Sequence, residues 1–201
     1  MSARLEFWFE FASTYSHVSA QRIEALAARA GVALAWRPFL LGPIFAKQGW
    51  NDSPFNLYPA KGAYMWRDME RVCADAGIPF RRPTQFPRNG LYAARIALAA
   101  ESEPWVGAFV RRVYLANFAE DREIAQAQLL RELLVSSGCP DPGLLLERAG
   151  SDANKARLRE RSEQALKLGI FGAPSFVVGG ELFWGNDRLE NALAWCQHSR
   201  S

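Results

Sequence analysis

In the stretch 6–17, an alternating aromatic pattern stops at Ala12 and gives way to a helical one. Phe7, Phe9 and Phe11 occupy alternate positions, and such alternation favours a half-buried β-strand. From Ser19 onward, apolar side chains recur at the spacing of an amphipathic helix. The chain therefore runs from a strand directly into a helix, and Ser13 lies at the turn between them.

Ser13 has two possible roles at this turn. Serine is a good helix N-cap, because its hydroxyl accepts a hydrogen bond from a backbone N–H of the first turn. The first N–H groups of a helix also lack internal partners and carry the positive end of the helix dipole. Such a place stabilises an anion, including a thiolate. The stretch by itself leaves both roles open.

The composition is that of an ordinary globular chain without a nucleic-acid partner. The 201 residues are 49% hydrophobic and 22% charged, and the net charge of +3 is too small to indicate nucleic-acid binding. The nearest approach to a basic cluster alternates along one predicted helix and is interpreted as a solvated face. Its members are Lys155, Arg157, Arg159 and Arg161.

The sequence predicts a cytoplasmic protein that neither enters a membrane nor binds a metal. No signal peptide precedes the first strand, and no apolar run approaches the 18 or so residues that a transmembrane helix needs. Cys73, Cys139 and Cys196 are odd in number and widely spaced, which fits neither a disulfide framework nor a metal-ligand set. We expect all three to be reduced thiols.

Further along, the chain divides into a βαβ start, a helical middle and a ββα end. A second strand at 32–37, with Gly31 before it as a helix C-cap, completes the βαβ unit. Gly179 and Gly180 predict a hairpin between strands 175–178 and 181–184, and Gly185 to Asp187 are expected to cap a last helix at 188–197. Residues 39–56 are expected to be irregular. The helices expected between the halves are 61–76, 91–100, 105–117, 124–136, 144–148 and 152–168, the last capped by Asp152.

Three motifs in this order give the chain a resemblance to a known family. They are the segments at 9–16 (FEFASTYS), 171–176 (FGAPSF) and 183–189 (FWGNDRL). The chain resembles the 2-hydroxychromene-2-carboxylate isomerases, which are grouped with kappa-class glutathione transferases and bacterial disulfide oxidoreductases. The resemblance implies an α/β fold, a thioredoxin-like domain (βαβ…ββα) with an all-helical insertion between its halves. The implied domains are 1–38 with 170–201, and the insert 39–169.

The resemblance also implies a glutathione site. Ser13 and Ser16 match the two cysteines of the thiol oxidoreductases, and two hydroxyls cannot form a disulfide. In the family the first serine donates a hydrogen bond to the glutathione thiol, which favours the thiolate. A cis peptide bond before Pro174 would turn the Ala173 backbone toward the tripeptide. Its γ-glutamyl end would be held by Trp184, Asn186, Asp187 and Arg188, although Asn186 and Asp187 could equally be helix caps.

The second substrate implied by the resemblance is a flat aromatic carboxylate. Such a molecule needs apolar walls and one or two cations. The usual proline after the serine is Thr14 here. Candidates for the walls are Phe45, Trp50, Phe55 and Tyr92; for the charge, Lys47, Lys61 and Arg88; and for hydrogen bonds, Asn51, Asn56 and Asn89.

The activity that this resemblance implies is a glutathione-dependent isomerisation, with glutathione as a cofactor regenerated in each cycle. A kappa-like glutathione transferase or peroxidase and a non-catalytic glutathione-binding module are the alternatives. A homodimer is possible. A helical protein in which Ser13 is only a cap is the simplest alternative.

Overall fold

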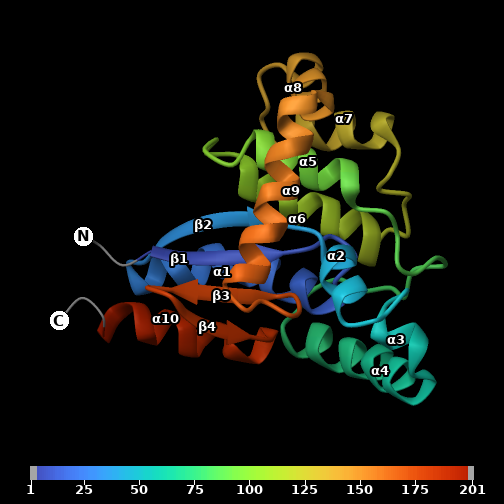
Figure 1. Ribbon diagram of the computed structural model, residues 1–201, viewed down its shortest axis with the longest axis vertical. Coiled ribbons are helices and arrows are strands. Elements are labelled where there is room, and N and C mark those ends of the chain that lie inside the picture. The colour runs from blue at the N-terminus through green and yellow to red at the C-terminus, as the bar shows by residue number, and fades with distance from the viewer. Residues whose placement is uncertain (1–3, 199–201) are drawn as a thin grey trace.

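The computed structural model describes residues 4–198, and a mixed four-stranded sheet lies at its centre (Figure 1). The order is β2-β1-β3-β4, with β1 parallel to β2 and antiparallel to β3, and β3 antiparallel to β4. The strands are β1 (Arg4–Phe9), β2 (Ala33–Pro38), β3 (Ser175–Val178) and β4 (Glu181–Trp184). The outer ends of the proposed thioredoxin-like domain, residues 1 and 201, lie outside the described residues.

Helices α1 (Thr14–Ala30) and α10 (Leu189–His198) pack on the face of the sheet that carries Phe7 and Phe9. Alternate positions of a strand face the same side, so both phenylalanines lie beneath these helices. Both are fully buried there. Gly31 ends α1 in the left-handed region, with φ of 64°, which confirms it as the C-cap.

The opposite face of the sheet is covered by parts of the helical segment. Trp8 is fully buried there against Phe39, Ile44 of α2 and Ala165 of α9. The predicted boundary between a thioredoxin-like domain and an insert remains a prediction, since the sheet shares its core with helices from both.

Eight helices lie between β2 and β3, and Figure 1 shows α9 running from the far end of this segment back to the sheet. The backbones of α3 and α4 lie so close together that only glycine fits at position 62. A Cβ on Gly62 would lie 2.2 Å from the Phe55 carbonyl oxygen. The eight are α2 (Leu41–Lys47), α3 (Pro54–Leu57), α4 (Pro59–Asp75), α5 (Leu91–Ala99), α6 (Val106–Phe118), α7 (Ala127–Ser136), α8 (Pro142–Gly150) and α9 (Asp152–Lys167).

Four local expectations were wrong. The segment 39–56 is not irregular throughout, because α2 and α3 form in it. The helix expected from residue 124 begins at Ala127. The cap of α9 is Ser151, whose hydroxyl accepts from the Asn154 N–H, and not Asp152. The last helix, α10, follows the short 3₁₀ turn η1 (Asn186–Arg188), whose N-cap is Gly185, as expected, but no side chain caps that turn.

Candidate functional site

The site is built around Ser13, where β1 ends and α1 begins. The Ser13 N–H donates to the Glu10 carbonyl oxygen over 3.0 Å, which closes a tight turn. The Ser13 hydroxyl accepts from the Ser16 N–H over 3.2 Å, so Ser13 is the N-cap of α1. The same hydroxyl donates to the Ala173 carbonyl oxygen over 2.9 Å. The hydrogen of Ser13 is therefore directed toward the loop before β3, and capping leaves it free to act as a donor.

The loop before β3 brings the second motif to Ser13. The Ala173–Pro174 peptide bond is cis, as expected. The Pro174 carbonyl oxygen accepts from the Gly185 N–H over 3.0 Å, which joins this loop to the turn after β4. Three segments that are far apart in the sequence, around residues 13, 173 and 185, thus form one continuous surface.

The third motif adds an anchored amide and exposed side chains to this surface. The Asn186 Oδ1 accepts from the Ser19 hydroxyl over 3.0 Å and from Arg22 Nη1 over 3.5 Å, so its side chain is tied to α1. Trp184 is 51% exposed and contacts Phe171, with ring centroids 4.8 Å apart. Asp187 and Arg188 are exposed and form an ion pair with each other over 3.2 Å.

Ser16 is not available at this surface. Its side chain is fully buried, whereas Ser13 is half-buried. The two serines that match the cysteines of the oxidoreductases are therefore unequal, and a ligand can reach only Ser13. The three cysteines of the chain, Cys73, Cys139 and Cys196, are all buried and free.

His17 lies in the first turn of α1 but is no partner for Ser13. It is fully buried, and its Nε2 lies 3.2 Å from the Pro79 carbonyl oxygen. Burial lowers the pKa of His17 to about 4, so the ring is neutral at pH 7 and its Nε2 carries the proton toward Pro79. Since a serine nucleophile needs an adjacent base, this geometry favours Ser13 as a hydrogen-bond donor.

Glu10 is a site residue that the sequence analysis did not identify. Its Oε2 accepts from the Ala12 N–H over 3.0 Å, and its Oε1 lies 3.4 Å from the place where a Cβ on Gly90 would be. Burial raises the pKa of the Glu10 carboxyl to about 7, while the hydrogen bond from Ala12 acts in the opposite direction. An acidic residue between Phe9 and Phe11, directly after β1, was the signal that could have indicated it.

The proposed substrate residues do not gather into one cluster. Phe55 lies beside Tyr15 of α1, with ring centroids 6.5 Å apart, and the Lys61 ammonium lies 5.8 Å from the centre of the Phe55 ring. Asn56 is exposed on α3 and donates to the Asp52 carboxylate. Of the proposed set, Phe55 comes near the start of α1, with Lys61 beside its ring.

The remaining members lie elsewhere or are already engaged. Lys47 lies at the end of α2 in a cavity with α5 and α9, and Asn51 is exposed. The Asn89 side chain accepts from the Leu91 N–H at the start of α5. Tyr92 donates to the Leu146 carbonyl oxygen, while Phe45 contacts Trp50.

Arg88 is buried, and only 5% of its surface is exposed. Its Nη1 donates to the backbone and side-chain oxygens of Asn117, and its Nη2 donates to Asp121. Asn117 in turn donates to the Phe11 carbonyl oxygen over 3.1 Å. The charge of Arg88 is thus used inside the protein, where it supports the turn that precedes Ser13.

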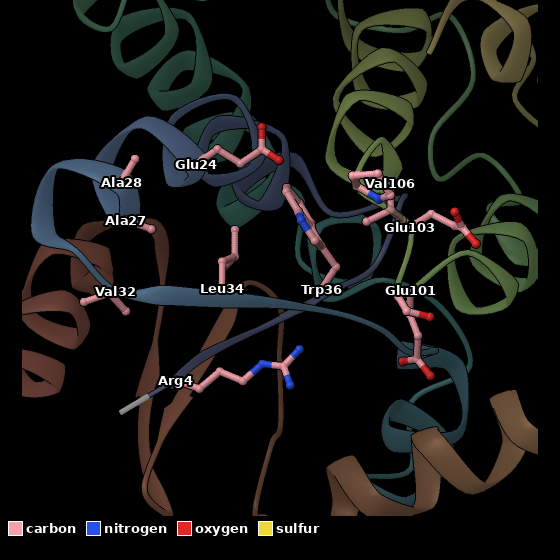
Figure 2. A pocket seen from close by; sticks show the side chains of 12 residues that line it. Arg4, Glu24, Ala27, Ala28, Val32, Leu34, Trp36, Glu101, Glu103 and Val106 are labelled. Carbon is pink, nitrogen blue, oxygen red and sulfur yellow. The ribbon is translucent and has the colours of Figure 1, made fainter. Parts of the chain in front are cut away.

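A separate cavity of 510 Å³ lies at β2, away from Ser13 (Figure 2). Leu34 and Trp36 point from the same side of β2 toward α1. Two of the three carboxylates that line it are paired: Glu24 with Arg111, and Glu101 with Arg37, Arg157 and Arg161, whereas Glu103 forms no ion pair among residues 4–198. No residue of 10–19 or 171–188 lines this cavity, so it is not part of the Ser13 surface.

Neither a metal cluster nor a membrane span occurs in the part of the chain that the structure describes. Among residues 4–198, no group of three or more histidine, cysteine or acidic side chains is placed to hold a metal ion. None of the helices in the same range combines the length and apolar character that crossing a bilayer requires.

Comparison with known proteins defines the class. The family model of the DSBA-like thioredoxin domain matches residues 4–194, and the chain belongs to this family. Within it, the chain is 30% identical to the 2-hydroxychromene-2-carboxylate isomerase of Sphingobium xenophagum, over 94% of this chain and 96% of that one. It is 23% identical to glutathione S-transferase kappa 1 of Caenorhabditis elegans, over 92% and 87% of the two chains.

A solved structure agrees with these relatives. The structure of a 2-hydroxychromene-2-carboxylate isomerase superposes with a TM-score of 0.83 at 26% identity, covering 98% of this chain and 97% of that chain. The recognised family and the thioredoxin-like α/β fold with its helices are thus confirmed.

Proposed function

We propose that this protein is a glutathione-dependent isomerase of aromatic carboxylates of the 2-hydroxychromene-2-carboxylate type. The observation that carries the proposal is the Ser13 hydroxyl. It lies at the N-terminus of α1, is half-buried, and directs its hydrogen 2.9 Å to the oxygen of Ala173. A thiol beside Ser13 and the loop of Pro174 would receive a hydrogen bond from this hydroxyl once the hydroxyl rotates from Ala173 to the sulfur, and that bond favours the thiolate form.

Glutathione is the thiol that this surface fits best. An extended tripeptide would pair with the backbone at Ala173 beside the cis proline. The amide of Asn186, the Asp187 carboxylate, Arg188 and the Trp184 ring would then hold its γ-glutamyl end, since a carboxylate suits an ammonium group. The kappa glutathione transferase among the relatives supports a glutathione ligand.

The proposed chemistry is addition, rotation and elimination. The sulfur of the thiolate forms a bond to one carbon of a conjugated C=C bond, and the electron pair moves into the conjugated carbonyl. The former double bond can then rotate, and loss of the thiolate restores it in the other geometry. Covalent addition splits one difficult step into two easier ones, and the thiolate is recovered unchanged.

The aromatic substrate is proposed to bind beside α3 and α4. Phe55 and Tyr15 supply apolar surface there, and Lys61 is the nearby cation. We place Asn56 at the same edge and keep Asn51 and Asn89 as candidate polar contacts. Thr14 donates to the sulfur of Met65 over 3.0 Å, so the start of α1 is fixed to α4 at this place.

A kappa-like glutathione transferase is the second candidate, because the same thiolate would serve it and a relative of that kind is found. The two are separated by incubating the protein with glutathione and a 2-hydroxychromene carboxylate. The isomerase converts the carboxylate, followed by absorbance, while the glutathione concentration stays constant. Consumption of glutathione in proportion to product would instead identify a transferase.

The role of Ser13 is tested by the pKa of the bound glutathione thiol, measured from the ultraviolet absorbance of its thiolate. A hydrogen bond to a charged group contributes about 1.5–3 kcal/mol, so Ser13→Ala should raise this pKa by about 1–2 units, toward about 8.5. Ser16→Ala removes a buried hydroxyl three residues away and is the matched control; it should leave the thiol pKa where it is.

Ser13→Ala also removes a helix cap, which costs about 0.5–2 kcal/mol of stability, so the melting temperature is measured beside the pKa. If both serine variants leave the thiol pKa unchanged and activity falls only with the folded fraction, Ser13 is a cap and the proposed mechanism is wrong.

A further inference from the structure

The cations of α9 fall into two groups that face different surroundings. Arg157 and Arg161, one helical turn apart, both bind the carboxylate of Glu101 over 2.8 Å. Lys155 and Arg159, also one turn apart, line a different region. The basic run that the sequence suggested to be one solvated face is thus split between an ion-pair network and a cavity.

That cavity, the α2–α5–α9 cavity, has a volume of 760 Å³, within the range of about 300–1,000 Å³ that is typical of small-molecule sites. Leucine and proline side chains from three helices and the segment before α2 supply apolar surface. The apolar residues that line it are Leu40, Pro43, Leu91, Leu158 and Leu166.

Its charges are strongly unequal. Five cationic side chains line the cavity, and the one carboxylate is that of Glu163. The cations are Lys47, Arg95, Lys155, Arg159 and Lys167. Lys155 pairs with Asp152 outside the lining, whereas the other four form no ion pair with any carboxylate among residues 4–198.

Among these cations, Arg95 also has a hydrogen-bond donor without a partner in the described chain. It is half-buried on α5, and this donor is its buried Nε. A buried donor that lacks a partner costs free energy, and an anion in the cavity would offset the repulsion among the cations.

The contrast with the cavity at β2 supports a ligand here. There, the carboxylates of Glu24 and Glu101 are neutralised by arginines. In the α2–α5–α9 cavity the excess charge has no protein counterpart. The chemistry that matches an apolar wall surrounded by unpaired cations is an amphipathic organic anion.

We propose that the α2–α5–α9 cavity is a binding site for an aromatic carboxylate, separate from the Ser13 surface. None of the residues that line it belongs to 10–19 or 171–188. The apolar residues contact the ring system, and Arg95 and Arg159 bind the carboxylate. The inference does not rest on the proposed isomerase activity, because neither glutathione nor Ser13 takes part in it.

Naphthoate is a suitable probe, because it joins a flat ring system to one carboxylate. Its binding to the full-length protein is followed by calorimetry, and its position by the backbone amide shifts of the isotope-labelled protein. We expect naphthoate to shift amides of α5 and α9 at residues 91–95 and 155–167. Shifts confined to residues 10–19, 54–75 and 171–188 would place the probe at the Ser13 surface or the proposed substrate site beside it, and would overturn the proposal.

Two related molecules test the two halves of the chemistry. Acetate has the charge without the ring, and naphthalene methanol has the ring without the charge. Both should bind at least about tenfold more weakly than naphthoate. Equal binding of acetate would mean that the cations attract any small anion, and the assignment of an aromatic ligand would be wrong.

Variants with matched charge changes locate the carboxylate. The double variant Arg95→Gln, Arg159→Gln should weaken naphthoate binding by about tenfold or more, because charge-assisted contacts are lost. Arg157→Gln removes the same charge from the same helix but outside the cavity, and should change the affinity by less than about twofold. An equal loss in both proteins, or naphthoate binding that neither weakens, contradicts the proposal.

Discussion

The glutathione side of the proposed site and the segment 41–90 beside it are built in opposite ways. On the glutathione side, hydrogen bonds join Ser13 to Ala173, Pro174 to Gly185, and Ser19 to Asn186. These are contacts across the ends of neighbouring strands and α1. The segment 41–90 consists of two short helices, the longer α4 and loops, and many of its polar residues, including Lys47, Asn51 and Lys61, are exposed.

This difference explains why one side has recognisable motifs and the other does not. A cis proline, a tight turn and a helix N-terminus each restrict the backbone, so they need particular residues at fixed positions. An exposed loop tolerates many sequences, and it is where binding residues usually vary. The proposed thiol-binding side is thus held by hydrogen bonds across the strand ends, and the adjacent segment is where a substrate preference would arise.

The strongest test of this contrast is Arg88→Gln. Arg88 lies in the segment 41–90, yet its charge is buried with Asp121 and Asn117. Breaking a buried ion pair costs about 3–5 kcal/mol, so the free energy of unfolding in denaturant should fall by that order. Lys61→Gln, an exposed cation of the same segment, is the control and should change stability by less than about 0.5 kcal/mol. An unchanged stability with a raised KM would make Arg88 a substrate ligand and break the comparison.

Glu10 lies where the two sides meet, and it makes stability depend on pH. Its pKa in the folded protein, about 7, lies above the ordinary value of 4.5. Between these values the unfolded chain loses its proton first, so Glu10 reduces stability as the pH rises from about 4.5 to 7, and most above 7. Glu10→Gln keeps the neutral form and should be more stable than the wild type by about 1–3 kcal/mol at pH 8, with little difference at pH 4.

The comparison uses urea unfolding of both proteins at the two pH values. A constant difference between them across this range would mean that Glu10 titrates normally and is not affected by its burial.

The smallest expected effect concerns Asn186, which ties the turn after β4 to α1. Asn186→Ala removes the acceptor for the Ser19 hydroxyl, a hydrogen bond that contributes about 1 kcal/mol. We expect glutathione affinity, measured by calorimetry, to fall about fivefold while the pKa of the bound thiol stays unchanged. A shifted thiol pKa would show that Asn186 also positions Ser13.

Much of the fold follows from local patterns. The alternation in residues 6–17, the helical spacing after Ser19 and the left-handed Gly31 predicted the βαβ start, and two glycines predicted the hairpin between β3 and β4. The predictions that failed concerned the ends of helices and the short helices. α2 and α3 were missed because short helices carry too few residues for a clear periodicity.

The residues of the site were likewise predicted only in part. Ser13, Ala173 and Pro174 were predicted from motifs, and the structure places them together. Arg88 was assigned to the substrate because a charged residue in a loop has no visible partner in the sequence. Its partners, Asn117 and Asp121, are 29 and 33 residues away, and only the folded chain brings them to it.

The amino-acid sequence alone determined the βαβ start, the ββα end and the hydroxyl at the start of α1, because these depend on neighbouring residues. The tertiary structure decided which charges remain available. Arg157 and Arg161 bind Glu101, while Arg159, on the same helix, faces a cavity with no carboxylate paired to it among the described residues. The free energy of a charge depends on its burial and on what lies within a few ångströms, and packing sets both.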